Sequence, residues 1–224
     1  MSLGIRTKLS PALARHTVRR AFQRFAAKYD LVYFGQVDQR TDEHQLVRGV
    51  TATAWHRDRH YSVGHINGYD VTILRRDDRL SFPGKPTHDY HWAIMQLDLR
   101  ASLPHVFIDA NHYDETFYAH LLVRLSRLQN FNHMFENASY ADFAKAFKVY
   151  GQPELATHLY QLITPEIATM LKAHFSQFDY EIADDKLIIY AQTRLITEHL
   201  LEHMLRVGLW LAEQLEDTKT ASVI

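Results

Sequence analysis

Residues 143–190 have the sequence FAKAFKVYGQPELATHLYQLITPEIATMLKAHFSQFDYEIADDKLIIY, and this stretch decides the fold that we predict for the chain. Its apolar pattern predicts a strand, two short helices and two further strands, in that order. Thr164 is suited to cap the second helix, and Pro165 is suited to its first position. The run ADD at residues 183–185 separates two β-prone segments and predicts a hairpin turn. Together these elements indicate an α+β fold, in which helices pack on a sheet.

The flanking stretches add strands before this region and a helix after it. In the run YSVGHINGYDVTILRR, the pair Asn67-Gly68 separates two β-prone segments and predicts a two-residue type I′ hairpin. Residues 90–99 predict the next strand, and a short strand is predicted over 103–109. Because the connections are too short for helical crossovers, we predict an antiparallel β-sheet of about five to seven strands, a meander plus hairpins covered by helices. From Thr193 the leucines recur at helical spacing and predict a long C-terminal amphipathic helix over one face of the sheet.

The chain is expected to divide into three segments. We predict an N-terminal basic amphipathic helix within residues 1–30, a single α+β domain over 31–217 and a frayed tail over 218–224. Ser10 and Pro11 are placed to begin the first helix, as its cap and first residue. No apolar run approaches the ~20 residues of a membrane-spanning helix, and no signal peptide is recognisable. We therefore expect a cytoplasmic protein.

The composition excludes several functional classes. The chain has no cysteine, which excludes thiolate metal sites and disulfide-built scaffolds. Its formal net charge of −1 provides no overall attraction to nucleic acid, which we do not expect as a partner. No P-loop, Rossmann fingerprint or G-x-S-x-G motif occurs, so we predict no cofactor.

Three motifs in and around the opening stretch bear on family membership. They are F-x3-F-x-V-Y, a Thr-Pro helix start with a leucine further on, and D-x-L-x-I on the last strand. The residues that carry them are Phe143, Phe147, Val149, Tyr150, Ile163, Thr164, Pro165, Leu171, Asp185, Leu187 and Ile189. These motifs resemble a bacterial family known only as a domain of unknown function, and the resemblance covers roughly residues 60–215. It implies the same fold and no catalytic residues; some relatives are attached to membranes through preceding helices, which this sequence does not contain.

Charge is distributed unevenly along the chain. Residues 1–30 hold seven Lys or Arg and one Asp, a net +6, whereas residues 179–217 hold nine acidic and three basic residues, a net −6. The polar face of the first helix carries Arg15, Arg19, Arg20, Arg24 and Lys28. This face is either simply solvated or a contact for an acidic partner or a membrane surface. The oppositely charged ends can also pair within one molecule or between copies in a homo-oligomer.

The absence of a coherent catalytic set leads us to expect a non-enzymatic protein-interaction or scaffold domain, with a protein partner or a second copy of the chain. The run His56-Arg57-Asp58-Arg59-His60 is most simply a charged turn. Phosphate binding is an alternative for this run, although no glycine-rich loop before a helix supports it.

Histidines provide the alternative hypothesis, a metal-dependent hydrolase. His199 and His203 form an H-x-x-E-H pattern with Glu202, and histidines four residues apart on a helix can share one Zn²⁺. Strand alternation places Asp89 and His91 on one face, where they are a second candidate for metal binding. In the competing interpretation, the first pair lies on the polar flank of a helix and the second at a solvated strand end.

Overall fold

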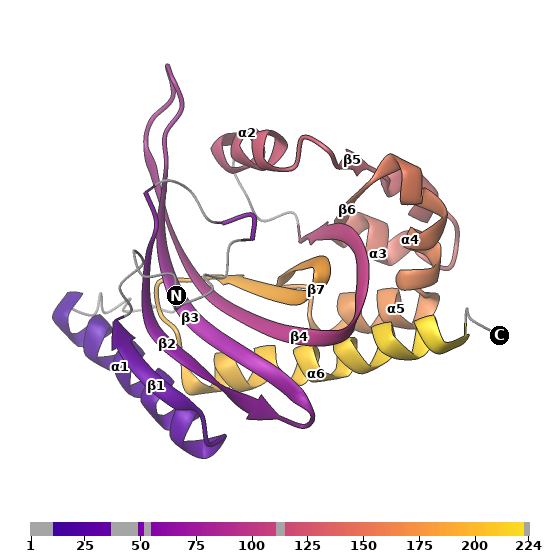
Figure 1. Cartoon of the computed structure of the whole chain (residues 1–224). Helices are drawn as coiled ribbons and strands as arrows, with labels where there is room; N and C mark the ends of the chain where they lie inside the picture. Colours follow the sequence, from indigo (N-terminus) through magenta and orange to yellow (C-terminus); the bar gives the residue numbers. More distant parts are fainter. Residues whose placement is uncertain (1–10, 37–48, 52–54, 111–114, 222–224) are drawn as a thin grey trace, which may run out of the picture.

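Seven strands form one antiparallel sheet in the computed structural model, which describes residues 11–36, 49–51, 55–110 and 115–221 (Figure 1). The strand order is β1-β2-β3-β4-β6-β5, and β7 also pairs with β4. The β7 strand runs along one edge of β4, and the other edge pairs first with β3 and then with β6. The strands are β1 Val32–Gln36, β2 Arg57–Ile66, β3 Tyr69–Leu80, β4 His88–Asp109, β5 Gln129–Asn130, β6 Lys148–Gly151 and β7 Asp179–Gln192.

The described residues contain six α-helices and two short 3₁₀ helices. They are α1 Pro11–Lys28, α2 Glu115–Arg124, η1 Asn132–Phe135, α3 Ala141–Ala146, η2 Pro153–Leu155, α4 Ala156–Leu162, α5 Pro165–His174 and α6 Glu198–Ala221. Figure 1 shows α6 running beneath the sheet with α1 at one end of it, while α2 lies on the opposite side. The predicted α+β class, with an antiparallel sheet covered by helices and a long C-terminal helix, is confirmed.

Side-chain alternation divides the apolar interior into two cores. Ala93 and Met95 of β4 point into the larger core, which α1 and α6 close with residues such as Phe22 and Leu201. Trp92 and Ile94 point into a smaller core, which α2 closes. Burying both faces of β4 in this way makes it the central strand of the protein.

Local turn and cap signals predicted several elements correctly. Asn67 and Gly68 both have positive φ, 50° and 89°, as the central positions of a type I′ turn require. Thr164 caps α5 by accepting a hydrogen bond from the Ile167 N–H at 3.3 Å. The last helix begins at Glu198 rather than at Thr193, because the Thr197 hydroxyl accepts the hydrogen bond of the Leu200 N–H and acts as the cap. Ser10, the predicted cap of the first helix, lies outside the described residues.

Two predicted interruptions of strands are wrong, and they occur at the same place. The hairpin predicted at residues 183–185 does not form, because β7 continues through this run and pairs with β4 on both sides of it. The two strands predicted over residues 90–109 are likewise one strand. The pairing is irregular at Leu103, opposite Asp184, whose φ is +56°. Both strands bend together here, and a bulge therefore replaces the predicted turn. Pro104, which has no N–H to donate, lies within this irregular stretch.

Candidate functional site: a basic groove

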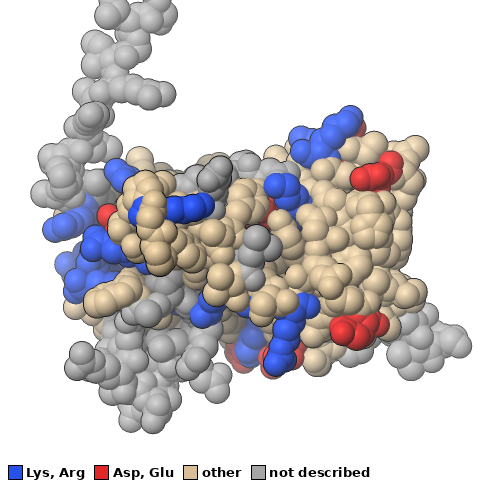
Figure 2. All heavy atoms as spheres, turned by 90° about the horizontal axis from the view of Figure 1, so that it is seen from above, with Lys and Arg blue, Asp and Glu red and all other residues tan. Residues whose placement is uncertain are grey.

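Arginine side chains gather where the N-terminal half of α1 approaches the ends of β2, β3 and β4. Two cavities of about 380 and 450 Å³ lie here and share Arg15, Arg59 and His60 as lining residues. We call them together the basic groove, which is lined by Arg15, Arg19, Arg57, Arg59, Arg75 and Arg79, by His16, His60 and His91, and by Asp77, Asp78 and Asp89. Figure 2 shows Lys and Arg side chains concentrated at this end of the molecule.

The strand register brings these side chains together. Arg57 lies opposite Asp77 and Arg59 lies opposite Arg75 across the β2–β3 ladder. On the other side of β3, Asp77 lies opposite His91 and Arg79 opposite Asp89. Since alternate residues of a strand share a face, one face of three neighbouring strands carries a row of charged groups.

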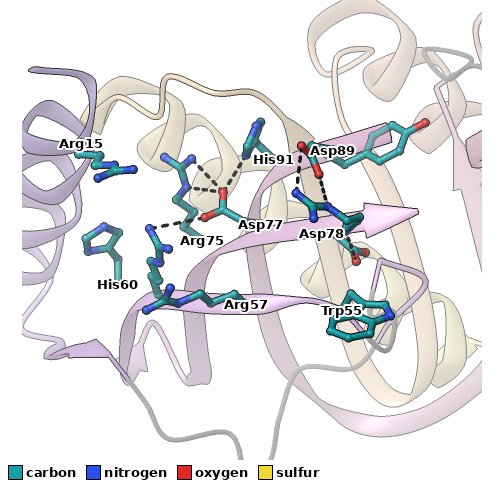
Figure 3. A pocket seen from close by; sticks show the side chains of 12 residues that line it. Arg15, Trp55, Arg57, His60, Arg75, Asp77, Asp78, Asp89 and His91 are labelled. Carbon is teal, nitrogen blue, oxygen red and sulfur yellow. Dashed lines mark hydrogen bonds and ion pairs between the residues drawn. The ribbon is translucent and has the colours of Figure 1, made fainter. Parts of the chain in front are cut away.

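Asp77 is the centre of the groove (Figure 3). Its Oδ1 accepts hydrogen bonds from Arg75 Nε at 3.1 Å and Nη2 at 2.9 Å, and it lies 2.7 Å from His91 Nδ1. Its Oδ2 lies 3.8 Å from Arg59 Nη1. Burial favours the protonated carboxyl, but the hydrogen bond to His91 and the charge of Arg75 outweigh it and lower the pKa of Asp77 to about 2. Asp77 is therefore ionised at neutral pH, with both oxygens engaged.

His60 contributes an uncharged imidazole to the wall of the groove. It has φ +56° and lies at a bulge of β2, between Arg59 and Ser62. Its ring stacks on Phe22, with 5.3 Å between ring centroids, and its Nδ1 lies 2.8 Å from the Tyr33 hydroxyl. Burial, followed by the nearby charges of Arg75 and Arg59, lowers the pKa of His60 to about 4. His60 therefore adds no positive charge to the groove at neutral pH.

Three of these arginines, Arg15, Arg19 and Arg57, have no carboxylate partner among the residues that the structure describes, and Arg15 and Arg57 line the same cavity. In Figure 3 Arg15 approaches from α1 beside His60, and Arg57 extends along β2 toward the same side of Asp77. The Nε–H of Arg59 is buried and has no hydrogen-bond acceptor within the described part of the chain. Burial lowers the pKa of Arg59; Asp77 opposes this effect, whereas the charges of Arg57, Arg75 and Arg15 add to it. The groove thus holds more positive charge and more N–H donors than its own carboxylates satisfy.

The opposite face of the same strands carries a buried ion pair with two hydrogen bonds between its members. Arg76 Nε and Nη2 each donate to Asp58 at 2.7 Å, and Arg76 Nη1 donates to the Thr51 hydroxyl at 3.2 Å. Arg76 is fully buried and Asp58 is 4% exposed, so this pair is closed to ligands. It ties the start of β2 to β3 and to the 49–51 segment.

The predicted basic face of the first helix is not a single surface. All four of these arginines are exposed, but Arg15 and Arg19 line the groove, whereas Arg20 and Arg24 line neither cavity. Lys28 lies on a third side and forms an ion pair with Glu202 of α6. One contact between the basic N-terminal and acidic C-terminal segments is therefore made within the molecule.

The predicted metal ligands are placed in separate environments. His91 and Asp89 both lie in the groove, but His91 contacts Asp77, and Asp89 accepts a 2.7 Å hydrogen bond from Arg79 Nε. His199 and His203 are neighbours on α6, with ring centroids 6.2 Å apart. The ring of His203 packs against Phe175 and Phe178, and its Nδ1 lies 3.0 Å from Gln177 Nε2. Within the described part of the chain, no three His, Asp or Glu side chains are grouped as a metal site.

The phosphate alternative for residues 56–60 included Arg57 and Arg59, whereas Arg75 and Arg79 were not predicted as site residues. The expected charged turn is the beginning of β2. A usable signal was present, because R-x-R in one strand of the Asn67-Gly68 hairpin and R-x-D-x-R in the other both alternate with strand periodicity.

The fold and the groove define an α+β protein with one curved antiparallel sheet and an arginine-lined groove at one end. This structure is similar to the crystal structure of the mycobacterial trehalose monomycolate transport factor A, TtfA, with a TM-score of 0.60 over 91% of this chain and 95% of that chain. The sequences are 11% identical, so the similarity shows a shared fold alone. No protein-family model matches the chain, and comparison with curated protein sequences gives no match either. Among the described residues, no helix has the length and apolarity needed to cross a membrane.

Proposed function

We propose that the protein is a non-enzymatic interaction module that binds an acidic segment of a partner protein in the basic groove. The observation that carries this proposal is that Arg15 and Arg57 line one cavity and have no carboxylate partner among the described residues. Six arginines and three aspartates line the groove, which leaves a net charge of +3 when the imidazoles are neutral. Such a surplus attracts acidic ligands and rejects basic ones.

We propose a different protein as the partner, rather than a second copy of this chain. Much of the acidic C-terminal segment is already engaged within the molecule: Asp179 and Glu181 are buried, and Glu202 pairs with Lys28. The Glu216 carboxylate accepts hydrogen bonds from the Tyr69 hydroxyl and the Arg100 N–H. These acidic groups cannot also neutralise the groove of another copy without breaking contacts within their own. The similar fold of a protein named as a transport factor is compatible with a role other than catalysis.

Fluorescence anisotropy with a labelled glutamate-rich peptide tests the proposal. We expect saturable binding that weakens as the salt concentration rises from about 0.05 to about 0.5 M, because surface charges are screened. Arg15→Glu should reduce the affinity by about tenfold, and Arg20→Glu, which makes the same charge change on the outer face of the same helix, by less than about twofold. Equal effects of the two variants, or no binding by the natural protein, would contradict the proposal. Circular dichroism establishes that both variants are folded.

A further inference from the structure

The part of the groove between α1 and β2 is lined by Arg15, Arg57 and Arg59, which together present more N–H donors than one carboxylate can satisfy. Asp77 illustrates what one carboxylate can satisfy: Arg75 and His91 contact its Oδ1, and Arg59 approaches its Oδ2. Arg15 and Arg57 pair with no carboxylate among the described residues. Each guanidinium presents five N–H donors in a planar fork, which suits an anion with several oxygens.

The guanidinium groups also repel one another. Burial disfavours the charged form of Arg59, and the charges of Arg57, Arg75 and Arg15 add to this effect. The negative charge of Asp77 opposes it. An anion placed among these groups relieves the repulsion, and the relief increases with the charge of the anion. A phosphoryl group carries about −1.5 to −2 charge at neutral pH and three acceptor oxygens, whereas a carboxylate carries one charge and two oxygens.

We infer that the part of the basic groove between α1 and β2 is a subsite for a phosphoryl group, contacted by Arg15 from α1 and by Arg57 and Arg59 from β2. This inference rests on the proposed function, and it assigns the phosphoryl group to a phosphorylated side chain of the acidic partner segment. Arginines from separate elements can surround a tetrahedral anion, and their fork geometry matches phosphate oxygens. The neutral imidazole of His60 forms the wall beside them and adds no charge.

A matched pair of peptides tests the subsite. Both contain the same glutamate, glycine and serine residues, and they differ only at one central position, which is phosphoserine in one and glutamate in the other. We expect the phosphopeptide to bind about tenfold more tightly to the natural protein. Arg57→Ala should remove most of this preference, Arg57→Lys should retain only part of it because the planar fork is lost, and Arg20→Ala should leave it unchanged.

The results of this experiment test the phosphoryl subsite separately from the binding of an acidic partner segment. Equal affinity of the two peptides, or a preference that survives in Arg57→Ala, overturns the phosphoryl subsite while leaving the acidic partner in place. Failure of both peptides to bind overturns both proposals. Vesicles containing phosphatidic acid form another arm: binding that requires Arg57, without any preference for the phosphopeptide, overturns the assignment to a partner protein and moves the phosphoryl group to a lipid.

Discussion

Arg59 lies directly opposite Arg75 across the β2–β3 ladder, although like charges facing each other in a sheet destabilise it. Asp77, two residues further along β3, lies between the two guanidinium groups and pairs with both. The local fold therefore depends on this one carboxylate for the neutralisation of two adjacent arginines. Arg15 and Arg57, which line the same cavity, pair with no carboxylate in the ranges that the structure describes.

We expect Asp77→Asn to destabilise the protein in a pH-dependent way. The pKa of Asp77 in the folded protein is about 2, below the value of about 3.9 in the unfolded chain. A lowered folded pKa contributes stability that is present above pH 4 and is lost as the pH falls toward 2, and here it amounts to about 2 kcal/mol. Urea unfolding at a series of pH values should show the free-energy gap between natural protein and variant shrinking below about pH 4. A gap independent of pH would show that Asp77 does not act through its charge.

The elements that the sequence predicted correctly are those with a local chemical cause. The Asn67-Gly68 turn, the Thr164 cap and the leucine spacing of α6 each act within one or two turns of chain, so neighbouring residues suffice to identify them. The errors at residues 103 and 183–185 have a cause that is distant in sequence. There β4 and β7 bend together, and neither strand alone indicates that the other will follow it.

The groove was only partly predictable for a similar reason. The two-residue turn at Asn67-Gly68 sets the register of the hairpin, in which Ser62 pairs with Ile73. If this register continued along β2, Arg59 would face Arg76. The bulge at His60 shifts the register by one residue and places Arg59 opposite Arg75. A shift of one residue exchanges the faces of a strand, so the bulge turns Arg59 of β2 toward the groove and places Asp58 opposite the buried Arg76.

Arg76 and Arg79 provide a matched comparison of a buried and an exposed ion pair on one strand. Arg76→Met leaves Asp58 buried without its counter-charge, and we expect a loss of about 3–5 kcal/mol in the free energy of unfolding. Arg79→Met breaks an exposed pair with Asp89, with side chains 60% and 51% exposed, and we expect a much smaller loss than for Arg76→Met. Urea denaturation measures both.

The double variant Arg76→Met, Asp58→Leu provides the control for the buried pair. Removing both charges eliminates the uncompensated carboxylate, so we expect most of the lost stability to return. If the double variant is as unstable as Arg76→Met alone, the loss comes from packing or from the Thr51 contact rather than from the unpaired charge.

Asp179 is expected to limit stability at high pH. Burial, together with the charge of the neighbouring Asp109, raises the pKa of Asp179 well above its usual range. The folded state therefore prefers the protonated carboxyl, and the protein loses stability as the pH rises above the pKa of an ordinary Asp. Asp179→Asn keeps an oxygen that can accept the Ala110 N–H at 2.8 Å and removes the charge.

We accordingly expect Asp179→Asn to raise the thermal midpoint at pH 8 and to change it little at pH 4. Thermal unfolding followed by circular dichroism at the two pH values provides the measurement, with Asp142→Asn at an exposed position as the control. A lower midpoint for Asp179→Asn at pH 8 would mean that the folded protein uses the charged form.

The metal-dependent hydrolase is the alternative hypothesis, and elemental analysis of protein purified without a nickel column can test it directly. We expect no stoichiometric metal, because a metal at His91 would have to displace Asp77 from Nδ1 or find further ligands at the other ring nitrogen. At the second candidate, His199 and His203 supply two imidazoles, and Glu202 pairs with Lys28 instead of completing the set. A bound metal lost in His91→Ala or in His199→Ala would reverse this expectation. Its loss in only one of them would also identify which cluster forms the site, since the two lie on different elements, β4 and α6.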